Sequence, residues 1–177
     1  YLGIHRYDDQ LVTYAPAARD AALSQLVPLQ QKIRAISPKN LDPNDQIDRE
    51  LILANLEDRR LDLAEVKWWS SDPVLYADEC VHGIYYLTLR QGSPVSKRAA
   101  AAVKRLIHIP RVLAEMRSNV PHPSAILATA AAEELTTGAS FIEALAGEET
   151  SFLSSTKRGP RQQAAMAAIA AMREAAA

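Results

Sequence analysis

The first residues whose types and spacing could do chemistry stand close to the start of the chain, in the run His5-Arg6-Tyr7-Asp8-Asp9. Paired carboxylates can act as acid and base when both face one site. Asp8 and Asp9 lie in a stretch without helical periodicity, so their side chains are not forced apart as they would be on a helix. This run predicts either the wall of a site or a hydrogen-bonded anchor for the N-terminal segment, and the residues leave both readings open.

The other acidic pairs differ because they fall on segments expected to be helical, among them Asp78-Glu79 and Glu133-Glu134. Adjacent residues on a helix diverge by about 100°, which makes them poor acid and base partners. We expect these pairs to be solvated.

The spacing of the histidines and the cysteine favours neither a metal site nor a catalytic nucleophile. The four histidines, at positions 5, 82, 108 and 122, have no second histidine or cysteine at ligand spacing, so no metal site is predicted in this segment. Cys80 and His82 stand two residues apart on an expected helix and point roughly 200° away from each other. Cys80 is interpreted as a small buried hydrophobe and not as a nucleophile. No catalytic residue is assigned.

Charge and composition exclude several partner classes. The 20 basic and 21 acidic residues give a formal net charge of −1, so no overall field attracts nucleic acid. With only 6 glycines, phosphate-cradling glycine loops are absent. Charged residues interrupt every apolar run well short of the roughly 20 residues that a membrane-spanning helix needs. We therefore predict no nucleic-acid partner and no membrane span.

The elements that position these residues are expected to be helices. Asp or Ser before Pro is typical of a helix start and occurs at Asp42-Pro43, Asp72-Pro73 and Ser93-Pro94. The pattern predicts helices over 16–36, 43–69, 73–90, 94–118, 123–146 and 160–177, with one short turn around 151–155. The fold class is therefore all-α, a multi-helix bundle of about six helices in which sequential neighbours are antiparallel. We expect residues 1–177 to form a single helical domain.

The expected second helix has two apolar stripes, one through Ile47, Leu51 and Trp68 and another through Ile52 and Leu63. A helix with two apolar faces normally has neighbours on two sides. This pattern predicts that residues 43–69 form a central helix of the bundle.

The expected fourth helix carries a basic face, with Lys97, Lys104 and Arg111 at heptad spacing. Such a face can contact phosphates or lipid headgroups. Without interleaved aromatics it more closely fits a solvated face or an inter-domain salt-bridge surface. The aromatic residues gather elsewhere, around the junction of the second and third helices, and are interpreted chiefly as core: Trp68, Trp69, Tyr76, Tyr85 and Tyr86.

Both ends suggest part of a longer protein. The chain opens without methionine, and its Ala-rich end runs to Ala177 without a glycine or asparagine that would stop a helix. We expect residues 1–177 to be the N-terminal fragment of a longer chain.

Three motifs together resemble a known bacterial family. They are Gly3-x-His5-Arg6-Tyr7-Asp8-Asp9, Asp45-x-Ile47-Asp48-Arg49-Glu50-Leu51, and Trp68-Trp69-x-x-Asp72-Pro73-x-x-Tyr76. In order and spacing they resemble the N-terminal region of the family called domain of unknown function eight-eight-five, over essentially the whole chain. Its members resemble all-helical zinc-dependent metallopeptidases, with a zinc motif in the C-terminal half.

The resemblance implies zinc for the full-length family but no cofactor within this segment, because the chain ends before any zinc motif. It implies candidates for a substrate cleft or an inter-domain surface: Arg6, Tyr7, Asp8, Asp9, Trp69 and Tyr76. It further implies a secreted, periplasmic or lipoprotein location, although no signal segment stands in this chain.

Two functions follow as hypotheses. The first is a non-catalytic N-terminal helical domain of a metallopeptidase-like hydrolase, whose partners are the remainder of its own polypeptide and a peptide substrate. It predicts an exposed apolar patch. The alternative is a stand-alone helical module that binds a protein or peptide, which predicts a finished polar surface.

Overall fold

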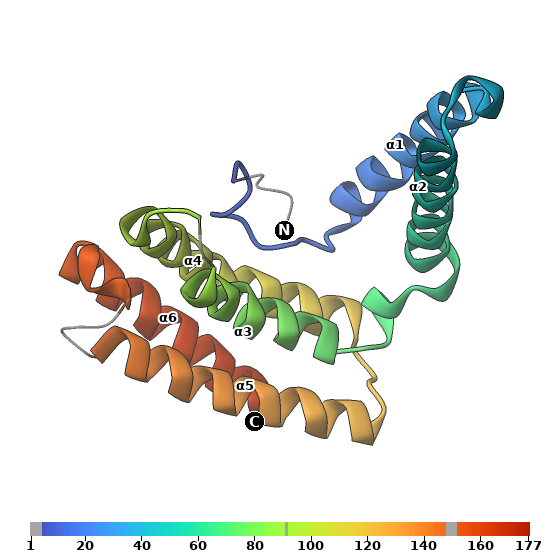
Figure 1. Ribbon diagram of the computed structural model, residues 1–177. Helices are drawn as coiled ribbons and strands as arrows, with labels where there is room; N and C mark the ends of the chain where they lie inside the picture. Colours follow the sequence, from blue (N-terminus) through green and yellow to red (C-terminus); the bar gives the residue numbers. More distant parts are fainter. Residues whose placement is uncertain (1–4, 91, 148–151) are drawn as a thin grey trace. The chain divides into compact units, whose positions relative to one another are not determined.

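The computed structural model describes residues 5–90, 92–147 and 152–177 (Figure 1). Contacts divide the chain into two compact units, the bundle unit (1–12 and 71–177) and the hairpin unit (13–70). Across the described residues the structure has six α-helices and no strand, which confirms the all-α prediction. The expectation of one domain stays a prediction, and each unit is described by itself.

The hairpin unit consists of α1 (Pro16–Ala35) and α2 (Pro43–Leu61), joined through a short 3-10 turn, η1 (Pro38–Asn40). α2 begins as the sequence predicts, because an Asp42 side-chain oxygen accepts hydrogen bonds from the backbone N–H of Asn44 (2.8 Å) and Asp45 (2.9 Å). These bonds satisfy N–H groups that have no partner within the helix.

The predicted end of this helix at residue 69 is wrong. α2 stops at Leu61 and is followed by a π-helical turn, η2 (Asp62–Val66), and a 3-10 turn, η3 (Trp68–Ser70). Lys67 between them has φ 57° and ψ 47°, the left-handed conformation that ends a helix. Left-handed residues are usually glycine, so a lysine in that role leaves no signal in the apolar periodicity.

The expected central position of α2 is also wrong. Within the hairpin unit α2 packs against α1, and none of its residues is buried. Ile47 and Leu51, which form one predicted stripe, are 59% and 55% exposed. In the second stripe, Ile52 is 44% exposed, whereas Leu63 beyond the end of α2 is only 3% exposed.

The bundle unit contains α3 (Val74–Leu89), α4 (Val95–Asn119), α5 (Ala125–Gly147) and α6 (Arg158–Ala176), with a short 3-10 turn, η4 (Phe152–Ser155). The predicted turn around 151–155 is confirmed from residue 152 on, whereas residue 151 lies outside the described residues. Predicted and observed bounds of α1 and of these four helices agree within two residues.

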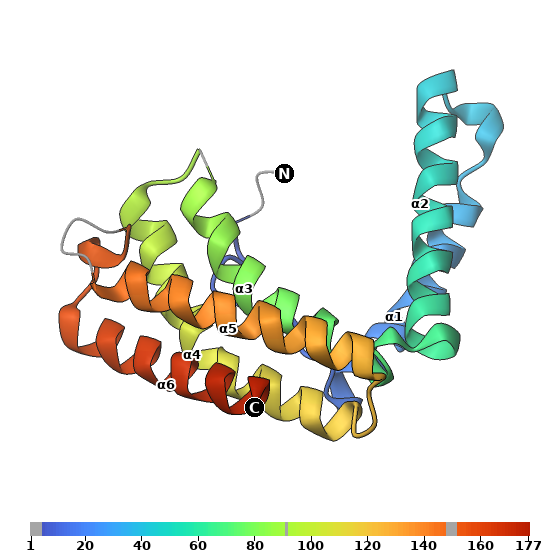
Figure 2. The same cartoon turned by 90° about the horizontal axis from the view of Figure 1, so that it is seen from below.

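The packing order of the bundle differs from the chain order. α3 packs on α4 and α5, and α6 packs on the same two helices (Figure 2). Sequential neighbours therefore pair as α3 with α4 and α5 with α6, while α4 and α5 occupy opposite corners. The side chains of Tyr76, Ile84, Leu106, Leu135 and Met172 are fully buried between the four helices.

Cys80 lies in this core with no exposed surface. Burial raises the pKa of its thiol well above the ordinary value, which keeps the group protonated. The interpretation of Cys80 as a small buried hydrophobe is confirmed.

Candidate functional site

The basic face of α4 forms a seat for the N-terminal segment, residues 5–12. Lys104 pairs with the Asp9 carboxylate at 2.8 Å, and Arg105 donates to the Asp8 carbonyl oxygen at 2.6 Å. About two turns further along, Arg111 donates to the carbonyl oxygens of Leu11 and Val12 at 3.4 Å each. Positive side chains on α4 thus face oxygen atoms of residues 8–12.

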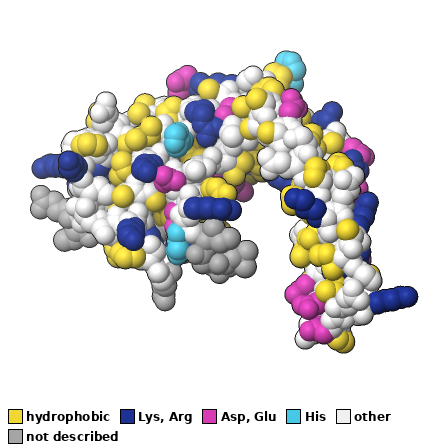
Figure 3. Space-filling view, turned by 90° about the horizontal axis from the view of Figure 1, so that it is seen from above, with side chains coloured by type: hydrophobic (Ala, Val, Ile, Leu, Met, Phe, Trp, Pro, Cys, Tyr) yellow, Lys and Arg dark blue, Asp and Glu magenta, His cyan; other side chains and the backbone are white. Residues whose placement is uncertain are grey.

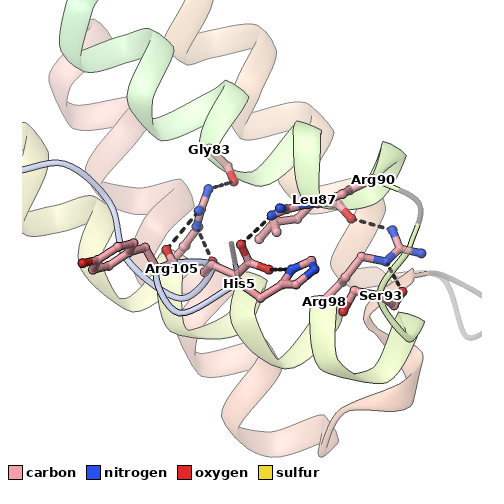
Figure 4. Close-up of polar contacts among 9 residues, drawn as sticks. His5, Gly83, Leu87, Arg90, Ser93, Arg98 and Arg105 are labelled. Atoms are coloured by element: carbon pink, nitrogen blue, oxygen red, sulfur yellow. Dashed lines mark hydrogen bonds and ion pairs between the residues drawn. The ribbon is translucent and has the colours of Figure 1, made fainter. Parts of the chain in front are cut away.

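Arg105 connects this segment to a second helix. Its guanidinium donates to the Gly83 carbonyl of α3 at 2.5 Å and to the Tyr7 carbonyl at 3.5 Å (Figure 4). Gly83 also allows the close approach, because a Cβ there would lie 2.7 Å from Leu11 Cδ2. Leu11 is only 6% exposed and anchors the segment in the core.

Asp8 forms the second half of the seat. Its two carboxylate oxygens bind Arg90, at the end of α3, and His5 Nδ1 at 2.9 Å. Burial by itself would raise the pKa of Asp8, but the hydrogen bonds from His5 and Arg90 outweigh it and hold the pKa below its ordinary value. Arg98 of α4 bridges the end of α3 and the start of α4, because it donates to the carbonyls of Leu87 (2.7 Å) and Ser93 (3.1 Å) (Figure 4).

Glu79 on α3 completes the anchor from the other side. Its carboxylate accepts a hydrogen bond from the Val12 backbone N–H at 2.7 Å. Burial raises the pKa of Glu79, and the nearby charges of Arg105 and Arg111 partly offset that rise. Asp78 and Glu133 are exposed as expected, but their pair partners Glu79 and Glu134 are half-buried, so the expectation of solvated pairs is only half right.

Two open hollows flank the ion pair between Asp9 and Lys104. The larger, of about 600 Å³, is lined by Gln10, Ile107, His108 and Arg111 together with the pair itself. The smaller, of about 300 Å³, is lined by His5, Arg6, Ser93 and Lys97 among others. Their basic side chains suit carboxylate or other anionic groups, since charged donors form the stronger hydrogen bonds with anions.

The sequence-predicted site residues do not all meet. Arg6, Tyr7, Asp8 and Asp9 lie together on the seat, with the Arg6 guanidinium 4.7 Å from the centre of the Tyr7 ring. Tyr76 has no exposed surface; its hydroxyl accepts a hydrogen bond from Asn119 at 2.9 Å within the bundle.

Trp69 belongs to the hairpin unit. Its indole N–H donates to the Leu63 carbonyl at 3.1 Å, and the Arg19 guanidinium lies 3.5 Å from its ring centre. These contacts hold the turn that follows α2.

Sequence reasoning missed three residues of the seat: Glu79, Gly83 and Arg90. Each lies on α3 or directly after it, more than 60 positions from its partner in the N-terminal segment. The only local signal was the spacing of Glu79 and Gly83, four apart and therefore on one face of a helix.

We expect acid to weaken the seat through Asp8. Because the pKa of Asp8 lies below its ordinary value of 3.8, its ionised form stabilises the fold above that pH, and the contribution is lost as the pH falls through the lowered pKa. Asp8→Asn should reduce the free energy of unfolding by about 1 kcal/mol at pH 7, measured by urea denaturation. The difference from the unaltered chain should shrink below pH 3.8.

The matched control is Asp58→Asn, which neutralises an exposed carboxylate on α2 and should change stability little at any pH. A cost of Asp8→Asn that stays constant with pH would contradict the role of its charge. No cost at all would favour a site wall over an anchor.

Comparisons with known proteins match this chain to a protein family and to a solved structure. A family model described as "Bacterial protein of unknown function (DUF885)" matches residues 1–177. A solved structure from Shewanella oneidensis, described as a candidate lipoprotein of unknown function, is 22% identical and superposes with a TM-score of 0.80. The match covers 98% of this chain and 32% of that chain, and at this identity it shows the fold alone. No curated protein gives a significant match.

Over the part of the chain that the structure describes, no helix combines the length and the apolar character needed to cross a membrane.

Proposed function

The chain belongs to the DUF885 family of bacterial proteins of unknown function, and from that premise we propose that it is a non-catalytic N-terminal helical part of a zinc-dependent, metallopeptidase-like hydrolase. In this proposal it contributes an inter-domain surface and one wall of a substrate cleft. The catalytic zinc and the catalytic residues belong to the remainder of the polypeptide.

The observation that carries the proposal is the apolar surface of the hairpin unit. Figure 3 shows hydrophobic side chains exposed along the hairpin among charged ones. Eight large apolar side chains of this unit are 43% to 59% exposed: Val27, Leu29, Ile36, Ile47, Leu51, Ile52, Val66 and Trp68. Exposed apolar side chains in such number on a small helical hairpin are typical of a surface that another element covers.

We assign the remainder of the same polypeptide as the occupant. The chain spans 32% of the length of the solved neighbour while 98% of its own residues match. A family member of that length has ample further chain to cover the hairpin. Burying a leucine or isoleucine contributes roughly 1.5–3 kcal/mol, so a few of these side chains suffice to hold an intramolecular interface.

The seat of the N-terminal segment supports the second half of the proposal. Its hollows expose Lys104, His108 and Arg111 beside Asp9. Lys104 pairs with Asp9 but keeps 63% of its side chain exposed, so the carboxylate of a peptide substrate can reach it. Because the solved neighbour is described as a candidate lipoprotein, we further propose a location outside the cytoplasm for the whole protein.

The proposal is tested by comparing the 177-residue chain with the full-length protein that contains it. Zinc content by atomic emission should be one ion per chain higher in the full-length protein than in the 177-residue chain. Turnover of a peptide library should be positive in the full-length protein only. Metallated but inactive full-length protein would contradict the hydrolase assignment. Binding of a foreign protein to the hairpin in place of the polypeptide's own remainder would favour the stand-alone module.

Leu51→Glu tests the interface directly. Leu51 is 55% exposed, so in the 177-residue chain the change should alter Tm by less than about 2 °C. In the full-length protein it places a charge in a buried apolar contact and should cost about 2 kcal/mol or more. Differential scanning calorimetry of both proteins measures the two effects.

Gln31→Glu is the matched control, because it adds the same charge at an exposed polar position of α1. It should leave both proteins unchanged. Equal effects of Leu51→Glu in the short and the full-length protein would show that the remainder of the chain does not cover this face.

A further inference from the structure

A second cluster of chemical groups lies on the bundle unit, away from the N-terminal segment in the sequence. Asp78 and His82 are four residues apart on α3 and share one face of the helix. α5 packs against α3 and brings Glu134 to the same place. One ligand atom from each of the three side chains lies within 4.8 Å of the other two.

The distances are close to those of a metal site. Two ligands about 2.0–2.2 Å from a tetrahedral zinc ion are roughly 3.4 Å apart. His82 Nδ1 and Asp78 Oδ1 are 3.4 Å apart. The remaining pairs of ligand atoms lie within 4.8 Å of each other.

The charge of the cluster calls for a cation. Two carboxylates and a neutral imidazole sum to two negative charges. Among the described residues, no lysine or arginine forms an ion pair with Asp78 or Glu134. A divalent ion would balance these charges.

Aromatic neighbours hold the histidine in place. The His82 ring stacks on Tyr86, with centroids 5.5 Å apart and planes at 23°, and meets the edge of Tyr85 at 6.4 Å. Tyr85 in turn contacts Phe141 of α5 at 6.0 Å. Packing of this kind restricts ring orientation, which is what a metal-binding histidine requires.

We propose that Asp78, His82 and Glu134 bind a divalent transition-metal ion of the zinc type and thereby clamp α3 to α5. One nitrogen and two oxygen donors suit Zn²⁺, whereas Mg²⁺ and Ca²⁺ prefer oxygen ligands alone. The Asp78 and His82 side chains are 54% and 42% exposed, so coordination positions stay open to water. A search for paired histidines or cysteines misses this site because its partner ligands are carboxylates, one of them 52 residues away along the chain.

The experiment titrates the EDTA-treated 177-residue chain with ZnCl₂ in a calorimeter, beside MgCl₂ and CaCl₂. We expect one zinc ion per chain and no comparable heat from the other two salts. Glu134→Gln keeps the shape of the side chain but removes its charge, and should weaken zinc binding about 10- to 100-fold. Glu133→Gln removes the same charge from the exposed neighbouring residue and should leave zinc affinity unchanged.

A second readout separates binding at this site from binding elsewhere. Saturating zinc should raise Tm by about 5 °C, because a ligand that binds only the folded chain stabilises it. His82→Gln should abolish both the stoichiometric heat and the Tm shift. The affinity should fall as the solution is made more acidic, because metal ligands must be deprotonated to bind the ion.

Three results would overturn the proposal. The first is the absence of a zinc-dependent heat and Tm shift. The second is an equal loss of affinity in Glu133→Gln and Glu134→Gln. The third is retention of zinc by His82→Gln, which would mean an adventitious ion only, bound by the histidines at positions 5, 108 or 122.

Discussion

Replacing Gly138 by alanine should destabilise the bundle unit by about 1–3 kcal/mol, although alanine favours a helix over glycine by up to about 1 kcal/mol. A Cβ at this position of α5 would lie 2.3 Å from Val81 Cγ2 on α3 and 2.8 Å from Met172 Cε on α6. The methionine end can move, but the valine is β-branched and its rotamer is restricted. α5 must therefore shift away from α3, which weakens packing along the whole interface.

Gly147→Ala, at the end of the same helix, is the matched control. A Cβ there meets no atom within 4 Å, so the change should be neutral or slightly stabilising. Thermal denaturation measures both variants, and a loss of 1 kcal/mol corresponds to roughly 2–4 °C in Tm for a chain of this size. Equal Tm values for the two variants would contradict the close contact of the three helices at Gly138.

Replacing Arg105 by methionine should release residues 5–12 from the bundle and lower the free energy of unfolding by about 1–3 kcal/mol. Arg105 donates to the carbonyl oxygens of Asp8 (2.6 Å) and Gly83 (2.5 Å), one on the N-terminal segment and one on α3. Methionine keeps the apolar part of the side chain but leaves these oxygens without that donor. Burial of Leu11, which depends on the docked segment, is then lost as well.

Hydrogen exchange read by mass spectrometry should show faster exchange over residues 5–12 in Arg105→Met. Lys97→Met removes one positive charge from an exposed position of α4 and should leave exchange there unchanged. Arg105→Lys keeps the charge but loses the planar fork that reaches several carbonyls, so it should rescue little. Full rescue by lysine would mean that charge alone holds the segment.

The contacts of the seat also change the interpretation of the basic face of α4. Its pattern in the sequence is compatible with phosphate or lipid contact, or with a solvated surface. In the structure Lys104, Arg105 and Arg111 all contact residues 8–12. Three of the cations that could have attracted an external polyanion are thus engaged within the chain.

Local signals predicted the helices well because helix formation depends on neighbours three and four residues apart. The prolines near the starts of α3 and α4 and the apolar spacing placed five of the six helices within two residues of their observed bounds, and Asp42-Pro43 placed the start of α2. The failure at α2 has a local cause too: Lys67 adopts a left-handed conformation that lysine rarely shows.

The sequence did not predict the position of α2, nor which residues come together in each site. Two apolar stripes show that a helix can bury two faces but not whether this chain supplies both neighbours. The seat joins Asp8 to Arg90 and Asp9 to Lys104, and the candidate metal cluster joins Asp78 and His82 to Glu134. These partners come from elements far apart in the sequence, and the type of a side chain does not show which elements pack together.

By itself, the sequence determined that this protein is all-α, where most of its helices begin and end, that Cys80 is buried, and that it resembles the DUF885 family. Only the tertiary structure decided that the basic face of α4 holds the N-terminal segment and that a histidine and two carboxylates meet between α3 and α5. It also showed that the interpretation of the aromatic residues as core is right for Tyr76 but wrong for Trp68, Tyr85 and Tyr86, which are exposed. The physical reason is the distance along the chain over which each kind of interaction acts. Helix propensity and capping act over a few residues, whereas sites form where the packing of apolar faces brings distant polar groups within bonding distance.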